Sequence, residues 1–183
     1  MAVTSWTDGN VALNNPVGSV AWSNPDNAKT SDDSHATSAL GKNSSTQELV
    51  LKDFGFSGTI GSGDTIDGIE VRTEKNSTSM TDHTVSLWNN DAKVGDNKAD
   101  TVTAWPTTDG TVDYGGASDL WNASLTTADI RGTAFGAVLR GQNGGLTANA
   151  NADVIQIRVH FTAGAGTPFQ PLFNRRTPTY LRM

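Results

Sequence analysis

The segment 153–162, with the sequence DVIQIRVHFT, alternates apolar and polar side chains from Ile155 to Phe161. A period of two places β-branched and aromatic groups on one face, and Gln156, Arg158 and His160 on the other. This is the pattern of a half-buried β-strand. An apolar sheet face must be covered by another layer, so the pattern predicts packed layers with at least one sheet.

Four other segments repeat this alternation, at 47–52, 66–73, 84–88 and 133–140. In the last, Phe135, Ala137 and Leu139 share one side, and we expect Phe135 and Ile157 to lie in the core. Phe54 and Phe56 continue the face of the first segment after an expected irregularity near Asp53.

The remaining segments show weaker secondary-structure patterns. We expect a short strand over 17–22, a loop over 24–33, and either a loose lead-in or an edge strand through Val11 and Leu13. One helical turn is predicted at 125–132, where Thr126 caps the start, Asp129 occupies the capping-box position and Gly132 stops the turn.

No segment shows apolar helical spacing over three turns, and Gly-rich turns separate the many short strands. The predicted fold is therefore all-β, an antiparallel, jelly-roll-like β-sandwich with an extended C-terminal arm. We divide the chain into an N-terminal extended segment (1–16), the sandwich domain (17–162) and the arm (163–183).

Charge separates the arm from the body. The chain has 13 basic and 19 acidic residues, and residues 163–183 hold three arginines and no acid. The body, with ten basic residues against 19 acids, is therefore acidic, which disfavours nucleic-acid binding. No apolar run is long enough for a membrane span, and the N-terminus does not read as a signal peptide.

The arm has the composition of a segment that lies against a partner. Three of the six prolines fall in it, and each removes a backbone donor. Large apolar groups and arginines are spaced along it, and we predict that these bind a partner: Phe169, Leu172, Phe173, Arg175, Arg176, Tyr180, Leu181 and Arg182. The alternative is that the arm covers an edge of its own sheet.

No motif for chemistry stands out. The three histidines have no nucleophile elbow near them, so we predict no enzyme activity, no catalytic residue and no cofactor. Two groups of aspartates could supply oxygen ligands to a structural calcium ion, although neither has EF-hand spacing and turn chemistry explains both. These groups are Asp26, Asp32 and Asp33, and Asp91, Asp96 and Asp100.

Five tryptophans leave a carbohydrate-binding function open, because exposed indole faces can stack on sugar rings. On that hypothesis Trp88, Trp105 and Trp121 point outward. The structural interpretation, which we prefer, is that tryptophans close the ends of the core and keep their N–H groups hydrogen-bonded.

The stretch 21–162 resembles a family of small β-sandwich proteins from the structural gene clusters of tailed bacteriophages. The resemblance rests on the order of several short pieces: AWSNPDNA at 21–28, FGF at 54–56, IDGIEV at 66–71, VGDNKA at 94–99, WP at 105–106, YGGASDLW at 114–121, ADI at 128–130 and FG at 135–136. The arm is not part of it.

The resemblance implies a non-enzymatic virion protein that is synthesised in the host cytoplasm. Within that class we expect a capsid cement or decoration protein on the outer capsid surface, bound to major capsid protein subunits and to its own copies, with a homotrimer as one arrangement. A tail, neck, baseplate or fibre subunit and a carbohydrate-binding adhesion module stay open as alternatives.

Overall fold

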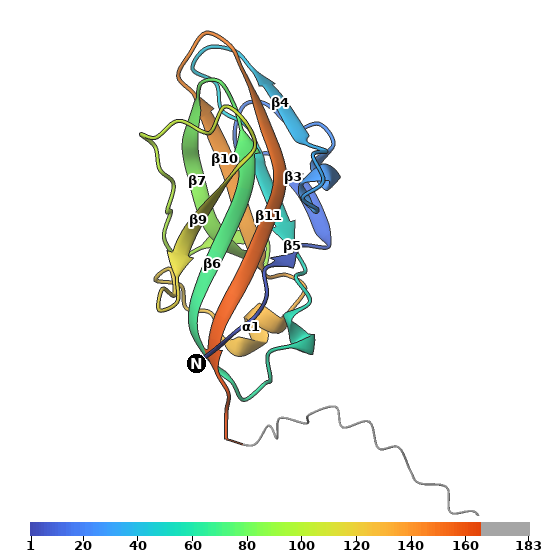
Figure 1. The fold of residues 1–183 in the computed structure, drawn as a ribbon, viewed down its shortest axis with the longest axis vertical. Coiled ribbons are helices and arrows are strands. Elements are labelled where there is room, and N and C mark those ends of the chain that lie inside the picture. Colours follow the sequence, from blue (N-terminus) through green and yellow to red (C-terminus); the bar gives the residue numbers. More distant parts are fainter. Residues whose placement is uncertain (166–183) are drawn as a thin grey trace, which may run out of the picture.

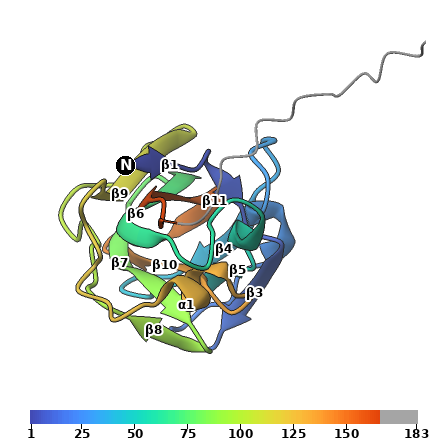
Figure 2. The same cartoon turned by 90° about the horizontal axis from the view of Figure 1, so that it is seen from below.

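The computed structural model describes residues 1–165, in which two curled antiparallel sheets pack face to face (Figure 1). Viewed from below, the two sheets curl around a shared interior (Figure 2). The prediction of an all-β sandwich is confirmed. Within the described residues no helix is both long and apolar enough to cross a membrane.

Sheet A is built around β11 and β6. It contains β1 (Ala2–Val3), β2 (Thr7–Asp8), β4 (Ala36–Leu40), β6 (Thr65–Asn76), β9 (Gly110–Gly116) and β11 (Ala148–Thr162). Sheet B has the order β3–β5–β10–β7–β8, and these strands are β3 (Val11–Asn15), β5 (Glu48–Lys52), β7 (Met80–Asn89), β8 (Ala92–Val94) and β10 (Gly136–Asn143).

Strand β11 organises sheet A because both of its edges are paired. One edge pairs with β6 along nearly its full length. The other edge is taken in turn by β4 at 148–152, by β2 at 156–157 and by β1 at 160–161. The first residues of the chain thus lie against its last described strand, although Ala2 and its partner Phe161 are almost the whole described chain apart in sequence.

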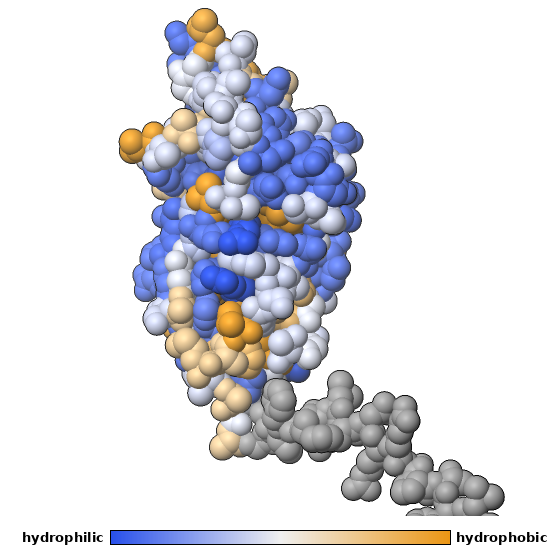
Figure 3. All heavy atoms as spheres, viewed as in Figure 1, coloured by the Kyte–Doolittle hydropathy of each residue, from blue (hydrophilic) through white to orange (hydrophobic). Residues whose placement is uncertain are grey.

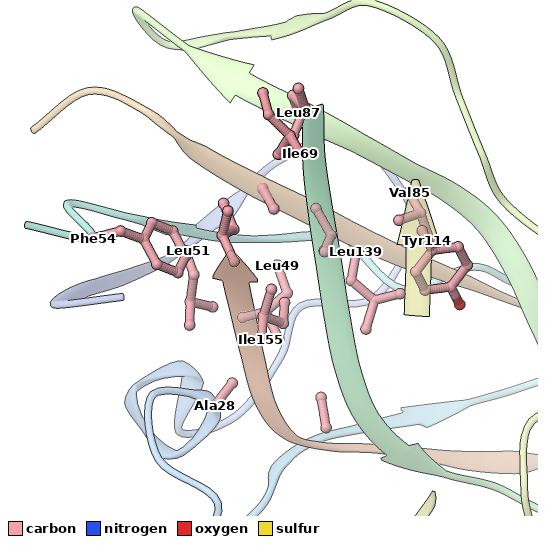
Figure 4. Close-up of a cluster of buried hydrophobic side chains, with 14 of the residues drawn as sticks. Ala28, Leu49, Leu51, Phe54, Ile69, Val85, Leu87, Tyr114, Leu139 and Ile155 are labelled. Atoms are coloured by element: carbon pink, nitrogen blue, oxygen red, sulfur yellow. The ribbon is translucent and has the colours of Figure 1, made fainter. Parts of the chain in front are cut away.

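The core lies between the sheets and follows the predicted alternation. Leu49, Leu51, Ile69, Leu139 and Ile155 point into it from both layers (Figure 4). The predicted core residues Phe135 and Ile157 are completely buried, and Phe54 stacks on Phe56 at the edge of the same cluster. A smaller apolar cluster on sheet B contains Leu13, Val50, Trp88 and Val138.

The helices are short. The α-helix α1 (Thr127–Arg131) begins at the predicted N-cap, where the Thr126 side chain and Asp129 form both bonds of a capping box. Two 3₁₀ turns, η1 (Pro25–Ala28) and η2 (Phe56–Gly58), lie in the connections. In Figure 1, α1 lies at the end of the sandwich where the described chain leaves it.

Two predictions differ from the structure. Residues 17–22 form no strand. Val20 makes a single bridge to Thr46, and Gly18, with φ of +127°, brings its backbone too close to the carbonyl of Thr46 for any Cβ. Conversely, β4, β8 and β9 were not predicted, because their small or glycine-rich sequences lack an apolar alternation.

Candidate functional site

The predicted partner-binding residues lie outside the described part of the chain. These are Phe169, Leu172, Phe173, Arg175, Arg176, Tyr180, Leu181 and Arg182. The described chain reaches Ala165, and just before it the backbone N–H of Gly164 donates to the Asp64 carboxylate at 3.0 Å. The arm therefore begins at a fixed point at the end of the sandwich that holds α1.

Four of the five tryptophans are core residues. Trp22, Trp88, Trp105 and Trp121 are each exposed by 4% or less. The indole N–H of Trp105 donates to Asp82 at 2.7 Å, and that of Trp121 donates to the Ile69 carbonyl at 2.8 Å. Trp105 and Trp121 are therefore not exposed for sugar stacking, and the structural interpretation holds for them. Trp88 is buried too, but it lies in the smaller cluster on the other face of sheet B, and its indole N–H has no hydrogen-bond partner among the described residues.

Trp6 is the exception. It is partly exposed, and it lies in the connection between β1 and β2 at the edge of sheet A. Two guanidinium groups lie against its ring, that of Arg72 at 4.2 Å and that of Arg158 at 4.5 Å from the ring centroid. Contacts at these distances are cation–π interactions, so the indole is held on the sheet rather than free to turn.

The arginines are in turn fixed by acids on neighbouring strands. Arg72 binds Asp113 through two hydrogen bonds of 2.7 and 2.8 Å, from β6 to β9. Arg158 donates to Glu70 at 2.8 Å, from β11 to β6, and His160 contacts the other oxygen of Glu70 at 2.5 Å. In the strand register Arg72 lies directly opposite Asp113, and Arg158 lies directly opposite Glu70. His160 lies diagonally across from Glu70, which is still within reach of a long side chain.

The Glu70 carboxylate is stabilised in its charged form. Partial burial raises its pKa, but the hydrogen bonds and charges of Arg158 and His160 outweigh that effect, and the net pKa lies below the ordinary glutamate value. The carboxylate therefore stays ionised at neutral pH and keeps the Arg158 side chain in place beneath Trp6.

Together these groups form a connected polar surface on the outer face of sheet A. We name it the Trp6 face, and it comprises Trp6, Glu70, Arg72, Asp113, Gln156, Arg158 and His160. Figure 3, which looks at β6 and β11 from outside, shows that the middle of this side is mainly hydrophilic. The surface can offer an aromatic ring together with several fixed donors and acceptors to a polar ligand.

The alternation of 155–161 correctly predicted that Gln156, Arg158 and His160 point outward. Trp6 was not singled out, because its neighbours Ser5 and Thr7 form no apolar pattern. Its position could have indicated a surface role, because Trp6 lies in a polar lead-in where a large aromatic side chain has no local core to enter. The pairing of the lead-in with β11 is a tertiary feature.

The aspartate groups proposed for calcium do not assemble. Residues 1–165 contain no group of three or more histidine, aspartate and glutamate side chains that could hold a metal ion. Asp100 instead accepts hydrogen bonds from Thr103 and Val102 in a turn, and these lower its pKa to about 2. The turn interpretation of this residue is thus confirmed.

A groove of about 520 Å³ lies at the end of the sandwich where the arm begins. Its walls are more apolar than the Trp6 face, and its lining includes Val3, Ile60, Asp64, Arg131, Phe161 and Ala163. Apolar side chains gather at the lower end of the molecule in Figure 3. Among residues 1–165, the titratable side chains that line the groove are those of Asp64 and Arg131.

No family model matches the chain, and no curated protein matches it. The solved structures that are similar to the chain over most of its length include the following three. One, described as "CBM4 structure and function", is 15% identical, with 85% of this chain and 94% of that chain covered and a TM-score of 0.41.

The second is the CBM22-1 xylan-binding domain from Paenibacillus barcinonensis Xyn10C, which is 11% identical, with coverage of 88% and 97% and a TM-score of 0.41. The third is the N-terminal cellulose-binding domain of Cellulomonas fimi β-1,4-glucanase C, at 11% identity, 88% and 90% coverage and a TM-score of 0.37. Likeness at this level carries no conclusion about a ligand.

Proposed function

We propose that the chain is a non-enzymatic binding module that contacts saccharides through the Trp6 face. The observation that carries the proposal is that Trp6, alone among the five tryptophans, is partly exposed and lies on two fixed arginines. A sugar presents an apolar C–H face and a rim of hydroxyl groups, so it requires an aromatic surface beside charged or amide hydrogen-bonding groups.

The preorganisation of the face supports this function. The bidentate pair with Asp113 leaves further N–H donors of Arg72 for a ligand, because a guanidinium carries five. Gln156 is held by Asp8 at 2.8 Å, and Arg158 by Glu70. Side chains that are already ordered lose little conformational entropy when a ligand binds.

The test is a glycan array followed by calorimetry on the saccharides that bind. Trp6→Ala is expected to weaken binding by at least about tenfold, the effect of removing a central aromatic anchor. Leu146→Ala is the matched control, because Leu146 is 75% exposed on another part of the surface. Absence of any specific saccharide binding by the wild-type chain, or equal binding by Trp6→Ala, would refute the proposal.

A second proposal, favoured by the sequence resemblance and by the basic arm on an acidic body, is a virion role. In it the chain is a capsid cement or decoration protein, and the arm attaches it to major capsid protein subunits. Most of the short sequence pieces that carry the resemblance contribute a buried aromatic residue to the packing of the fold. These residues are Trp22, Phe56, Trp105, Trp121 and Phe135. The resemblance therefore supports the fold and leaves attachment to be tested.

The attachment test compares the full chain with a chain ending at Ala165, which keeps every described strand and the Gly164–Asp64 bond. The shortened chain is expected to fold normally and to lose binding to the particle. Phe173→Ala in the full chain is expected to weaken binding more than Arg182→Ala. Counting copies on the particle separates the locations, since hundreds indicate capsid decoration and a dozen or fewer indicate a tail or fibre.

A further inference from the structure

Two oppositely charged side chains meet in the interior of the sandwich. Lys75 extends inward from β6 in sheet A, and Asp82 extends inward from β7 in sheet B. They are 1% and 3% exposed, and the Lys75 Nζ lies 2.5 Å from one carboxylate oxygen of Asp82, Oδ1. The pair therefore joins the two sheets through buried side chains, beside a small pocket of about 50 Å³.

Tyr114 completes a closed triangle with this pair. Its hydroxyl accepts a hydrogen bond from the Lys75 Nζ at 2.5 Å and donates to the Asp82 Oδ2 at 2.7 Å. One hydroxyl thus touches both the amine and the second carboxylate oxygen. A proton can pass from nitrogen to oxygen along bonds that already exist.

The Asp82 carboxylate has two more donors. The Trp105 indole N–H donates to Oδ1 at 2.7 Å, and the backbone N–H of Asp100 donates to Oδ2 at 3.2 Å. Donors placed on both oxygens are suited to stabilise negative charge that develops on them during attack at the carboxyl carbon.

Burial makes the charged form of this amine less favourable than it is in water. Burial lowers the pKa of Lys75, and the nearby carboxylates of Asp82 and Asp100 only partly oppose that effect. The ring centroids of Trp105 and Tyr114 lie 4.8 and 5.1 Å from the Nζ, and these cation–π contacts offset part of the cost of burying the charge. Keeping two separate charges in such a site is energetically expensive, whereas a neutral amide in their place removes the charges.

We propose that Lys75 and Asp82 condense to form an intramolecular isopeptide bond that links β6 to β7. The amine attacks the carboxyl carbon, a bond forms between Nζ and Cγ, and the bond between Cγ and Oδ2 breaks. The two protons that the ammonium group loses leave with Oδ2 as one water molecule, relayed by Tyr114. No oxidant, metal or cofactor takes part, and the proposal is independent of those on saccharide or capsid binding.

Holding the groups in contact lowers the barrier that dilute amines and acids face. Fixed reactants within about 3–3.5 Å react at effective concentrations of about 10⁵–10⁸ M. The product closes a loop of only a few residues, so its gain from unfolded-state entropy is small. Its main consequence is that the two sheets cannot separate at this end.

The first test is the intact mass of the purified full chain. The isopeptide bond lowers the mass by one water relative to the sequence. Trypsin digestion then locates the change, because a modified Lys75 resists cleavage and residues 73–93 stay together as one dehydrated peptide. An Asp-Gly pair such as Asp67-Gly68 can also lose water, by closing to a succinimide. Residues 73–93 contain no Asp-Gly pair, so a dehydrated 73–93 peptide does not arise in that way.

Variants separate the isopeptide bond from an ion pair. Asp82→Asn is expected to lose one ammonia and so to reach the same final mass as the wild type, because the product is identical. Lys75→Arg keeps the positive charge and is expected to show its full sequence mass. Tyr114→Phe removes the relay and is expected to slow the mass loss at least about tenfold.

The wild-type mass decides the matter even where a variant fails to fold. Full sequence mass after prolonged incubation, with normal cleavage after Lys75, would show that the pair is an ordinary buried ion pair and would overturn the proposal. A loss of water that maps to another peptide would overturn it as well.

Discussion

The indole N–H of Trp121 donates a hydrogen bond of 2.8 Å to the carbonyl oxygen of Ile69 on β6. Trp121 is completely buried, and its φ of 58° lies in the left-handed region that is uncommon for residues other than glycine. The loop after β9 thus accepts an unfavourable backbone conformation in order to place this ring in the core. The bond ties this loop to β6.

We expect Trp121→Ala to reduce the free energy of unfolding by about 3–5 kcal/mol, the usual effect of truncating a buried tryptophan. Urea denaturation followed by far-ultraviolet circular dichroism measures it. The control is Leu120→Ala in the same loop, where the side chain is 44% exposed and the expected change is within about 0.5 kcal/mol. Similar losses for both variants would contradict a specific role of Trp121.

Gly115 makes this arrangement possible. Its φ is +84°, and a Cβ there would lie 2.3 Å from the Ile69 carbonyl oxygen and 2.7 Å from the Trp121 indole nitrogen. Gly115→Ala is therefore expected to destabilise the protein by more than about 1 kcal/mol. The neighbouring Gly116→Ala is the control, because its Cβ would meet nothing closer than 4.0 Å. Equal melting temperatures for the two variants would show that the loop relaxes freely.

The two faces of β11 predict opposite responses to truncation. Ile157 is completely buried, and Ile157→Ala is expected to cost about 2–5 kcal/mol of unfolding free energy. Gln156, the preceding residue, points outward to Asp8, and Gln156→Ala is expected to change the free energy by less than about 0.5 kcal/mol. The denaturant midpoints of the two variants test the assignment of the faces. Reversed effects would refute it.

Glu70 gives stability a defined pH dependence. Its folded-state pKa lies below the ordinary value of 4.5, so the carboxylate binds a proton more readily in the unfolded chain. Its contribution is complete above pH 4.5 and is lost as the pH falls through the lower folded-state pKa. Glu70→Gln is therefore expected to lose less stability than the wild type between neutral pH and the acid range.

Urea midpoints measured from neutral pH down to the acid range provide the comparison. Glu74→Gln is the control, because Glu74 lies on the same outer face of β6 but contacts Ser31 rather than an arginine. Parallel midpoint curves for wild type and Glu70→Gln would show that Arg158 and His160 do not stabilise the ionised form.

The sequence by itself determined which side chains of the strands face the interior. Side chains alternate along a strand, so a period of two in 155–161 or 66–73 specifies which residues face inward without knowledge of the partner strand. The capping box at Thr126 and Asp129 was predictable for a similar reason, since its hydrogen bonds join residues three positions apart.

Only the tertiary structure decided which segments meet. The lead-in 1–8 contains no strong strand pattern, and it becomes ordered because β11 offers it an unpaired edge. That pairing brings Trp6 onto Arg72 and Arg158, which are far from it in sequence. The inward pairing of Lys75 with Asp82 likewise depends on two sheets facing each other across the core. Such contacts form only when segments far apart in sequence are brought together, and local sequence patterns do not encode which segments will meet.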